Sequence, residues 1–308
     1  MTTTTLTAKD VRSAVSMPEA IDAVRQAFVD LDAGAFEQPT RTALRDGQFL
    51  VMSAHHRPSS SAIVKTLSLN FDRIPAITGT VVWADTASVN HLVADAGSVT
   101  TLRTGAIVGV ATDLLAARDA DRMVLIGAGA QAPDQIRAVQ AVRSLRSLTI
   151  IDADAAKAQQ LVDSMSDELG ETEARVATDI ARAVSDTDII CCATSTKTPL
   201  FTADQLPAQV HVNAIGAFRP TMRELPSELL ADASVVIDER DAALEESGEI
   251  LHALREGHIE EGDLIELGAA LGRAGVDTNK RTVFKTVGVA VQDWAIARVL
   301  ADKLLKSS

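Results

Sequence analysis

The sequence predicts an α/β protein in which a doubly wound parallel sheet is combined with a second domain of the α+β class. Three observations support this prediction. Short apolar runs alternate with helical patterns between residues 123 and 238, which is typical of a parallel sheet. A glycine-rich turn follows the first of these runs. Between residues 48 and 94, several β runs follow one another without a helix, which indicates an antiparallel sheet.

The first domain begins with helix-start signals. The segments 7–10 and 16–19 both resemble N-terminal caps, and the second has the acid, Glu19, that completes a capping box. The helix that follows carries an apolar stripe and stops at Gly34. The next elements are expected strands at 49–52, 62–67, 77–83 and 91–94, and a long helix of small residues at 99–118.

The second domain is expected to contain the parallel strands, at 123–126, 148–152, 174–177, 188–193, 210–214 and 235–238. The strongly helical segment 288–306 follows the last of these elements, so we expect it to cross back onto the first domain. The predicted domains are therefore residues 1–117 together with 289–308, and residues 118–288.

A dinucleotide-binding motif opens the second domain. An apolar strand leads into Gly127-x-Gly129-x-x-Ala132, and a helix follows. Gly127 permits a tight turn, and Gly129 lets the backbone approach a pyrophosphate. The amides at the helix start, around Ala130 and Gln131, carry a partial positive charge that suits this anion. The alternative is an ordinary strand-to-helix turn, but the strand context favours a cofactor site of the Rossmann type.

The acid at the end of the second strand indicates which cofactor binds. Asp152 lies 23 positions beyond Gly129, where a carboxylate can accept both hydroxyls of an adenine ribose. A carboxylate at this position would repel a 2′-phosphate. We therefore expect NAD(H) in preference to NADP(H), which stays an alternative.

The composition argues against two classes of partner. The net charge of −13 disfavours nucleic acids and anionic membranes, because both require a basic surface. No apolar stretch has the length of a membrane span, and the first residues have neither a basic leader nor an apolar core. We expect a cytoplasmic protein.

The cysteines and histidines do not indicate a metal. Cys191 and Cys192 are adjacent on an expected buried strand, where neighbouring side chains point to opposite faces, so we interpret them as small core residues. The six histidines show no spacing that is typical of zinc ligands.

Three cations stand in segments that otherwise look buried. Arg41 precedes the first predicted strand, Lys65 interrupts an apolar strand, and Arg103 lies early in the long helix. Burying a cation is costly unless an anion balances it, and a nearby Asp or Glu is the usual partner. Together the three cations fit a pocket for a substrate carboxylate, which a guanidinium binds through two parallel hydrogen bonds.

Two further turns follow parallel strands at their carboxyl ends, where ligands bind in open α/β sheets. Ala193, Thr194 and Ser195 form a hydroxyl-rich turn that can contact ribose or nicotinamide, although a plain loop would look similar. Gly216 ends the next strand, where it would allow close approach of a nicotinamide.

These residues resemble the ornithine cyclodeaminase/μ-crystallin family. The resemblance runs from about Thr7 to Ala297 and rests on Pro39-Thr-Arg41, Met52, Lys65, Leu102-Arg-Thr104, Gly127 to Ala132, Gly216 to Leu225, Glu245-Glu-Ser-Gly248, Thr282 to Gly288 and Gln292-Asp293. It implies an NAD(P)-dependent enzyme acting on amino acids or their imines. It also implies a homodimer in which the first domain serves substrate binding and dimerisation.

The resemblance also implies roles for single residues. Arg41, Lys65 and Arg103 correspond to the residues that hold the substrate carboxylate, with Lys65 and Arg103 counted as catalytic. Thr104 corresponds to a threonine that approaches the cofactor, and Thr286 lies in a matching segment and is expected to contact the cofactor as well.

One departure from the family pattern narrows the activity. Deaminating members carry an aspartate where this chain has Phe218, and the lysine that often follows is replaced by Met222. A phenyl ring cannot hold an ammonium or move a proton. The resemblance is therefore closest to the Δ1-pyrroline-2-carboxylate (ketimine) reductases.

We therefore predict an NAD(P)H-dependent reductase of cyclic 2-carboxy imines, Δ1-pyrroline-2-carboxylate or Δ1-piperideine-2-carboxylate, yielding L-proline or L-pipecolate. The alternatives are an NAD-dependent L-amino-acid dehydrogenase, an ornithine cyclodeaminase and a crystallin-like binding protein. The proton on nitrogen can come from Lys65, from water or from the substrate itself, and the sequence does not decide among them.

Overall fold

The computed structural model describes residues 3–70, 72–86, 90–272 and 275–305. The chain divides into two compact units, one of Met1–Ile107 with Val289–Ser308 and one of Val108–Gly288. The first division falls inside helix α3 (Ala96–Leu115), which supplies residues to both units. Each unit is described separately below.

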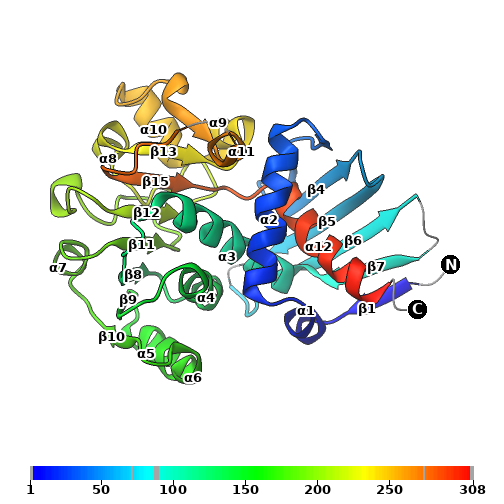
Figure 1. Cartoon of the computed structure of the whole chain (residues 1–308), viewed down its shortest axis with the longest axis horizontal. Coiled ribbons are helices and arrows are strands. Elements are labelled where there is room, and N and C mark those ends of the chain that lie inside the picture. The colour runs from blue at the N-terminus through cyan, green and yellow to red at the C-terminus, as the bar shows by residue number, and fades with distance from the viewer. Residues whose placement is uncertain (1–2, 71, 87–89, 273–274, 306–308) are drawn as a thin grey trace. The chain divides into compact units, whose positions relative to one another are not determined.

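The first unit is built on a seven-stranded sheet (Figure 1). Its long strands pair antiparallel, as the sequence predicts, but β1 pairs parallel with β7, so the sheet is mixed. The strands are β1 (Thr3–Leu6), β2 (Phe36–Glu37), β3 (Thr42–Leu44), β4 (Phe49–His56), β5 (Ser61–Leu69), β6 (Ile77–Asp85) and β7 (His91–Asp95). The sequence analysis missed β1 to β3, because short, mostly exposed strands carry no apolar alternation.

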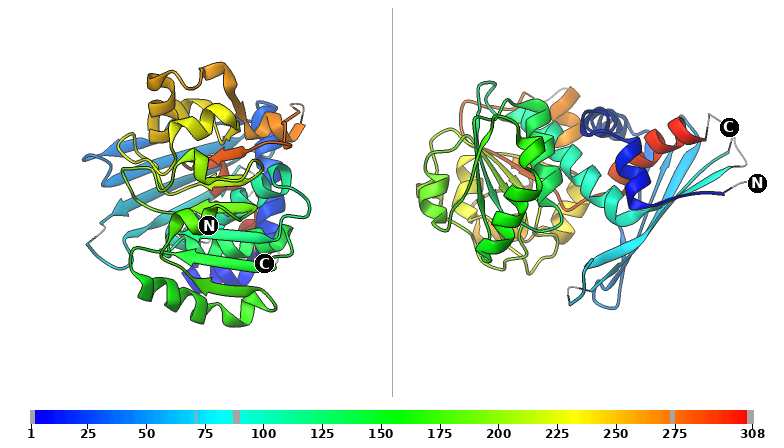
Figure 2. Two further views of the ribbon diagram at one scale, coloured as in Figure 1. Left: turned by 90° about the vertical axis from the view of Figure 1, so that its left-hand side faces the viewer. Right: turned by 90° about the horizontal axis from the view of Figure 1, so that it is seen from below.

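Helices cover one face of this sheet (Figure 2). They are α1 (Ala8–Ala14), α2 (Met17–Asp32) and α12 (Ala290–Leu304), and the last comes from the end of the chain. Thr7 caps α1, and Ser16 with Glu19 forms the predicted capping box of α2. Trp294 of α12 is buried and donates from Nε1 to Ser61 Oγ at 3.1 Å, which fastens the helix to β5.

The second unit contains an eight-stranded sheet in the order β10-β9-β8-β11-β12-β15-β13-β14, and every pair in it is parallel. This confirms the predicted doubly wound α/β class. The strands are β8 (Arg122–Ile126), β9 (Ser147–Ile151), β10 (Glu173–Val176), β11 (Ile189–Cys192), β12 (His211–Ala214), β13 (Ser234–Ile237), β14 (Leu264–Glu266) and β15 (Thr282–Lys285).

Strand β15 was not predicted, although it lies between β12 and β13 in the sheet. The run Thr282-Val-Phe-Lys285 is fully buried and ends in a lysine, so its pattern does not distinguish a strand from a loop. The lysine is tolerated because Glu249 lies beside it, a contact that the local sequence does not show.

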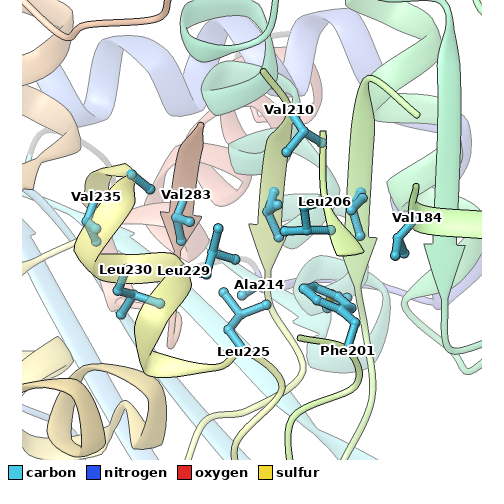
Figure 3. Packing of buried hydrophobic residues seen from close by; sticks show 14 of the residues in the cluster. Val184, Phe201, Leu206, Val210, Ala214, Leu225, Leu229, Leu230, Val235 and Val283 are labelled. Atoms are coloured by element: carbon cyan, nitrogen blue, oxygen red, sulfur yellow. The ribbon is translucent and has the colours of Figure 1, made fainter. Parts of the chain in front are cut away.

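Helices flank the sheet of the second unit, and apolar side chains fill both of its faces. The helices are α4 (Ala132–Val142), α5 (Ala155–Ser164), α6 (Ser166–Leu169), α7 (Ile180–Val184), α8 (Ser227–Asp232), α9 (Arg240–Glu246), α10 (Gly248–Glu256) and α11 (Leu267–Gly272), with single 3-10 turns η1 (Ala203–Gln205) and η2 (Glu261–Asp263). Figure 3 shows part of the cluster on one face, which includes Val210, Leu225 and Leu229.

The two cysteines pack into this sheet core. Cys192 belongs to the cluster of Figure 3 and Cys191 to the cluster on the other face. Both are free thiols, and burial raises the pKa of Cys191 to about 12.

Within the described ranges, no helix combines the length and apolar character needed to cross a bilayer. The same ranges contain no group of three or more potential metal ligands.

Candidate active site

A buried ionic cluster lies in the first unit. Lys65 on β5 is fully buried, and its Nζ donates to Asp293 Oδ1 at 2.7 Å and to Thr100 Oγ1 at 2.6 Å. Arg103 on α3 donates from Nη1 to Gln292 Oε1, and its Nε lies 3.7 Å from Asp293 Oδ1. The cluster therefore brings β5, α3 and α12 together through charged side chains.

Local structure explains why these side chains meet. Lys65 lies between Ile63 and Leu67 on the inward face of β5, because alternate strand residues point to the same side. Asp293 lies in the first turn of α12, where the helix dipole favours a carboxylate. Thr100 lies about one turn before Arg103 on α3, so both can face the same point.

The cluster has an unusual electrostatic state. Burial lowers the pKa of Lys65 to about 8, Asp293 opposes that shift, and the neighbouring charges of Arg103 and Arg41 lower it further. Lys65 is therefore an ammonium at neutral pH but lies close to its titration point. Among the described residues, none donates a hydrogen bond to the buried Asp293 Oδ2, so this oxygen can accept from a bound molecule.

The sequence analysis selected the cations of this cluster but not their partners. The charges of Arg41 and Arg103 lower the pKa of Lys65, so the three predicted cations lie near one another in the first unit. The carboxylate-pocket hypothesis requires such a grouping. The alternative interpretation, in which each cation pairs with an acid of the protein, also holds for Lys65, because Lys65 forms an ion pair with Asp293. Asp293 and Gln292 were noted as part of a family motif and given no role. The sequence did contain a signal for them, since Gln292 and Asp293 are two polar residues in the first turn of an otherwise apolar helical segment.

The glycine-rich turn lies at the end of β8 in the second unit. Gly127 has φ +106°, and a Cβ added there would lie 2.5 Å from the carbonyl oxygen of Ala193, so only glycine fits. A Cβ on Gly129 would meet nothing within 4 Å, which leaves its backbone open to a ligand. Gln131 lies at the N-cap position of α4 without a capping hydrogen bond from its side chain, and Ala130 precedes it at an exposed position. This turn fits the pyrophosphate of a dinucleotide.

Asp152 follows β9 beside this turn. Its Oδ2 accepts the N–H of Ala128 at 2.8 Å, and its Oδ1 accepts the N–H of Asp154 at 2.9 Å. Each carboxylate oxygen has further capacity to accept, so both remain available to ribose hydroxyls. The placement is the one that the NAD(H) interpretation requires.

A second buried network joins the turns after β11 and β12. Glu224 accepts from Thr194 N at 2.6 Å, Thr194 Oγ1 at 2.8 Å, Gly216 N at 2.8 Å and Ala217 N at 3.2 Å. Burial raises the pKa of Glu224, and the nearby charge of Lys285 and the bonds from Thr194 oppose that shift. Ala193 is partly buried and Ser195 is exposed in the same turn.

The structure gives Gly216 a role that the sequence did not suggest. A Cβ at this position would lie 2.1 Å from Thr194 O and 2.3 Å from Thr194 N. Glycine is therefore required by the contact between the two turns, whether or not a nicotinamide also approaches.

The two threonines expected near the cofactor already have intramolecular bonds. Thr286 Oγ1 donates to Asp238 Oδ2 at 2.6 Å, and Thr104 Oγ1 donates to Thr100 O at 2.6 Å. Both side chains are buried, and each hydroxyl oxygen can still accept a hydrogen bond. Glu224 and Asp238 were missed, because a motif does not show which backbone amides a carboxylate will reach.

These features define a class. The protein has a dinucleotide-binding α/β unit and a second unit with a buried cationic cluster suited to a small anion. More specifically, the chain belongs to the ornithine cyclodeaminase/mu-crystallin family, whose model matches residues 1–308. The resemblance seen in the sequence motifs is thereby confirmed.

Similar proteins agree with this assignment. A Delta(1)-pyrroline-2-carboxylate reductase of Bacillus cereus is 33% identical, with 98% of this chain and 96% of that protein aligned. The Thermococcus litoralis Delta(1)-pyrroline-2-carboxylate reductase in complex with NADH and L-proline has a TM-score of 0.92 at 29% identity, covering 99% and 98% of the two chains. An archaeal alanine dehydrogenase dimer with bound NAD has a TM-score of 0.90 at 29% identity, covering 100% and 97%.

Proposed function

We propose that this protein is an NADH-dependent reductase of cyclic 2-carboxy imines. The substrate is Δ1-pyrroline-2-carboxylate or Δ1-piperideine-2-carboxylate, and the product is L-proline or L-pipecolate. The observation that carries the proposal is the buried cluster of Lys65, Arg103 and Asp293, which has more cations than anions and suits a carboxylate. The Bacillus and Thermococcus reductases support the choice of substrate.

The cationic cluster binds the substrate carboxylate. Arg41, Lys65 and Arg103 are the cations that we propose for this role: the charges of Arg41 and Arg103 act on Lys65, and Asp293 lies 2.7 Å from Lys65 Nζ and 3.7 Å from Arg103 Nε. Arg103 offers a planar fork for two parallel hydrogen bonds. Fixing the carboxylate orients the C=N carbon, and this positioning supplies much of the catalysis.

The second unit binds the cofactor, whose nicotinamide supplies the hydride. Gly127, Gly129 and the amides of Ala130 and Gln131 receive the pyrophosphate, and Asp152 receives the adenine ribose. Asp152 disfavours a 2′-phosphate, so NADP(H) is the weaker alternative. The remaining cofactor contacts that we propose are Thr104, Ala193, Thr194, Ser195, Gly216 and Thr286.

Lys65 Nζ is the group in the cluster best suited to give the proton that the nitrogen requires. A general acid works best when its pKa lies near the working pH, and the pKa of Lys65 is about 8. The guanidinium of Arg103 does not lose a proton at such pH. Asp293 keeps the ammonium of Lys65 charged until it reacts.

A steady-state assay tests the proposal. Purified protein is mixed with the cyclic imine and either NADH or NADPH, and loss of the reduced cofactor is followed with chiral analysis of the amino acid formed. Reduction to the L-product, faster with NADH, is expected. Oxidation of L-alanine by NAD without imine reduction would favour the dehydrogenase, and cofactor binding without turnover would favour a binding protein.

We also propose a homodimer located in the cytoplasm. The archaeal alanine dehydrogenase dimer supports the first point, as do Val64 and Val82, which lie 46% and 36% exposed on the sheet face opposite the inward-facing Lys65 and Val81. Light scattering on the purified protein tests it, and a monomer at micromolar concentration would contradict it. Cell fractionation tests the location.

A further inference from the structure

The carboxylate of Glu224 joins the turn after β11 to the turn after β12. Its Oε1 accepts both the N–H and the hydroxyl of Thr194, and its Oε2 accepts the N–H groups of Gly216 and Ala217. Glu224 is fully buried. One side chain therefore fixes the spacing of the two turns.

The chemistry of this contact favours an ionised carboxylate. Three of the four neighbouring groups are backbone N–H groups, which can only donate, and both of the groups that reach Oε2 are of this kind. Glutamine has the same shape, but its NH₂ group would face a backbone N–H in either orientation: that of Thr194 at one position, or those of Gly216 and Ala217 at the other. The Glu224→Gln change therefore disrupts one of the two turns while it leaves the volume unchanged.

The backbone of Glu224 is held in place as well. Its N–H donates to Glu249 Oε1 at 2.8 Å, and Glu249 Oε2 lies 3.1 Å from Lys285 Nζ. Lys285 in turn donates to the carbonyl of Ala217. A Cβ on Gly248 would lie 1.7 Å from Met222 O, so the start of α10 packs closely against the segment that leads into Glu224.

The position in the sheet indicates what this arrangement serves. In doubly wound sheets the dinucleotide crosses the switch point between the two halves, and each half binds one mononucleotide. Gly127 and Asp152 follow β8 and β9 in one half, whereas the turns held by Glu224 follow β11 and β12 in the other. We propose that Glu224 is a positioning residue for the nicotinamide ring of the cofactor. This inference rests on the proposed function.

The test compares NADH with ADP-ribose, which has every part of the cofactor except the nicotinamide ring. Binding of NADH and of ADP-ribose, which lacks nicotinamide, is measured by titration calorimetry for the parent and for Glu224→Gln. We expect NADH to bind at least about tenfold more weakly to the variant, because buried bonds to a charged group are lost. ADP-ribose affinity should change less than about twofold. Glu239→Gln is the matched control, since Glu239 caps α9 and should affect neither ligand.

Each other outcome is informative. Equal weakening of both ligands would show a general structural role and overturn the proposal, as would unchanged NADH affinity. If Glu224→Gln does not fold, Glu224→Asp keeps the acceptors on a shorter side chain and should show the same selective loss of NADH. A parent protein that binds NADH but reduces no imine would overturn the proposed reaction. The role of Glu224 would still be decided by the comparison of NADH and ADP-ribose affinities.

Discussion

Replacing Asp293 with Asn should move the pH dependence of catalysis. Asp293 Oδ1 lies 2.7 Å from Lys65 Nζ, and both side chains are fully buried. Asn keeps the size of the side chain and an acceptor for the lysine but removes the negative charge. Because Asp293 raises the pKa of Lys65, its loss should lower that pKa below about 8.

The size of the effect follows from the protonated fraction of Lys65. With a pKa of about 8, Lys65 is about three quarters protonated at pH 7.5. A contacting opposite charge changes a pKa by roughly 1–3 units, and the middle of that range leaves about one thirtieth protonated. If the ammonium is required, kcat/KM at pH 7.5 should fall roughly 25-fold, whereas the loss at pH 5.5 should be less than about twofold.

The assay is a pH profile of kcat/KM for imine reduction, which reports the free enzyme. The parent should lose activity as pH rises through about 8, and the variant should lose it at lower pH. Asp302→Asn is the matched control, because Asp302 lies on the same helix in an exposed pair with Arg298. A variant whose alkaline limb coincides with that of the parent would refute the reasoning.

Four further predictions concern Arg103, Asp152 and Phe218. Arg103→Lys removes the planar fork that can form two parallel hydrogen bonds with the substrate carboxylate, so transition-state binding should weaken by on the order of 2 kcal/mol. We expect kcat/KM to fall and NADH affinity to stay unchanged. An unaltered kcat/KM would show that Arg103 does not bind the substrate. Asp152→Ser should relax a preference for NADH by removing the repelling charge, which a comparison of both cofactors in parent and variant checks, and a parent that prefers NADPH would contradict it. The parent should release no ammonia from L-ornithine with NAD, because Phe218 replaces the carboxylate of the deaminases. Phe218→Asp should also weaken imine reduction, since it replaces an apolar ring with an anion that would repel the substrate carboxylate. Steady formation of ammonia and proline by the parent would restore the cyclodeaminase interpretation.

The strands of the second unit were largely predictable. The runs at 123–126, 148–152 and 210–214 are apolar because both faces of each strand are buried, so their pattern is local and visible. β15 was not predictable in this way, because its short buried run ends in Lys285, and the partner that makes this lysine tolerable, Glu249, is not visible in the local sequence. The place of a strand in a sheet is set by pairing at a distance, which periodicity does not encode.

The same distinction between local pattern and long-range contact applies to the candidate site. The sequence alone determined the fold class, the glycine turn with Asp152, and the presence of cations in apolar segments, since each depends on neighbouring residues. Only the tertiary structure decided their partners: Lys65 and Asp293 are 228 positions apart, and Glu224 reaches Thr194 across 30 positions. A buried charge shows in the sequence that it needs a partner, but the partner is whichever side chain the packing brings within hydrogen-bond distance.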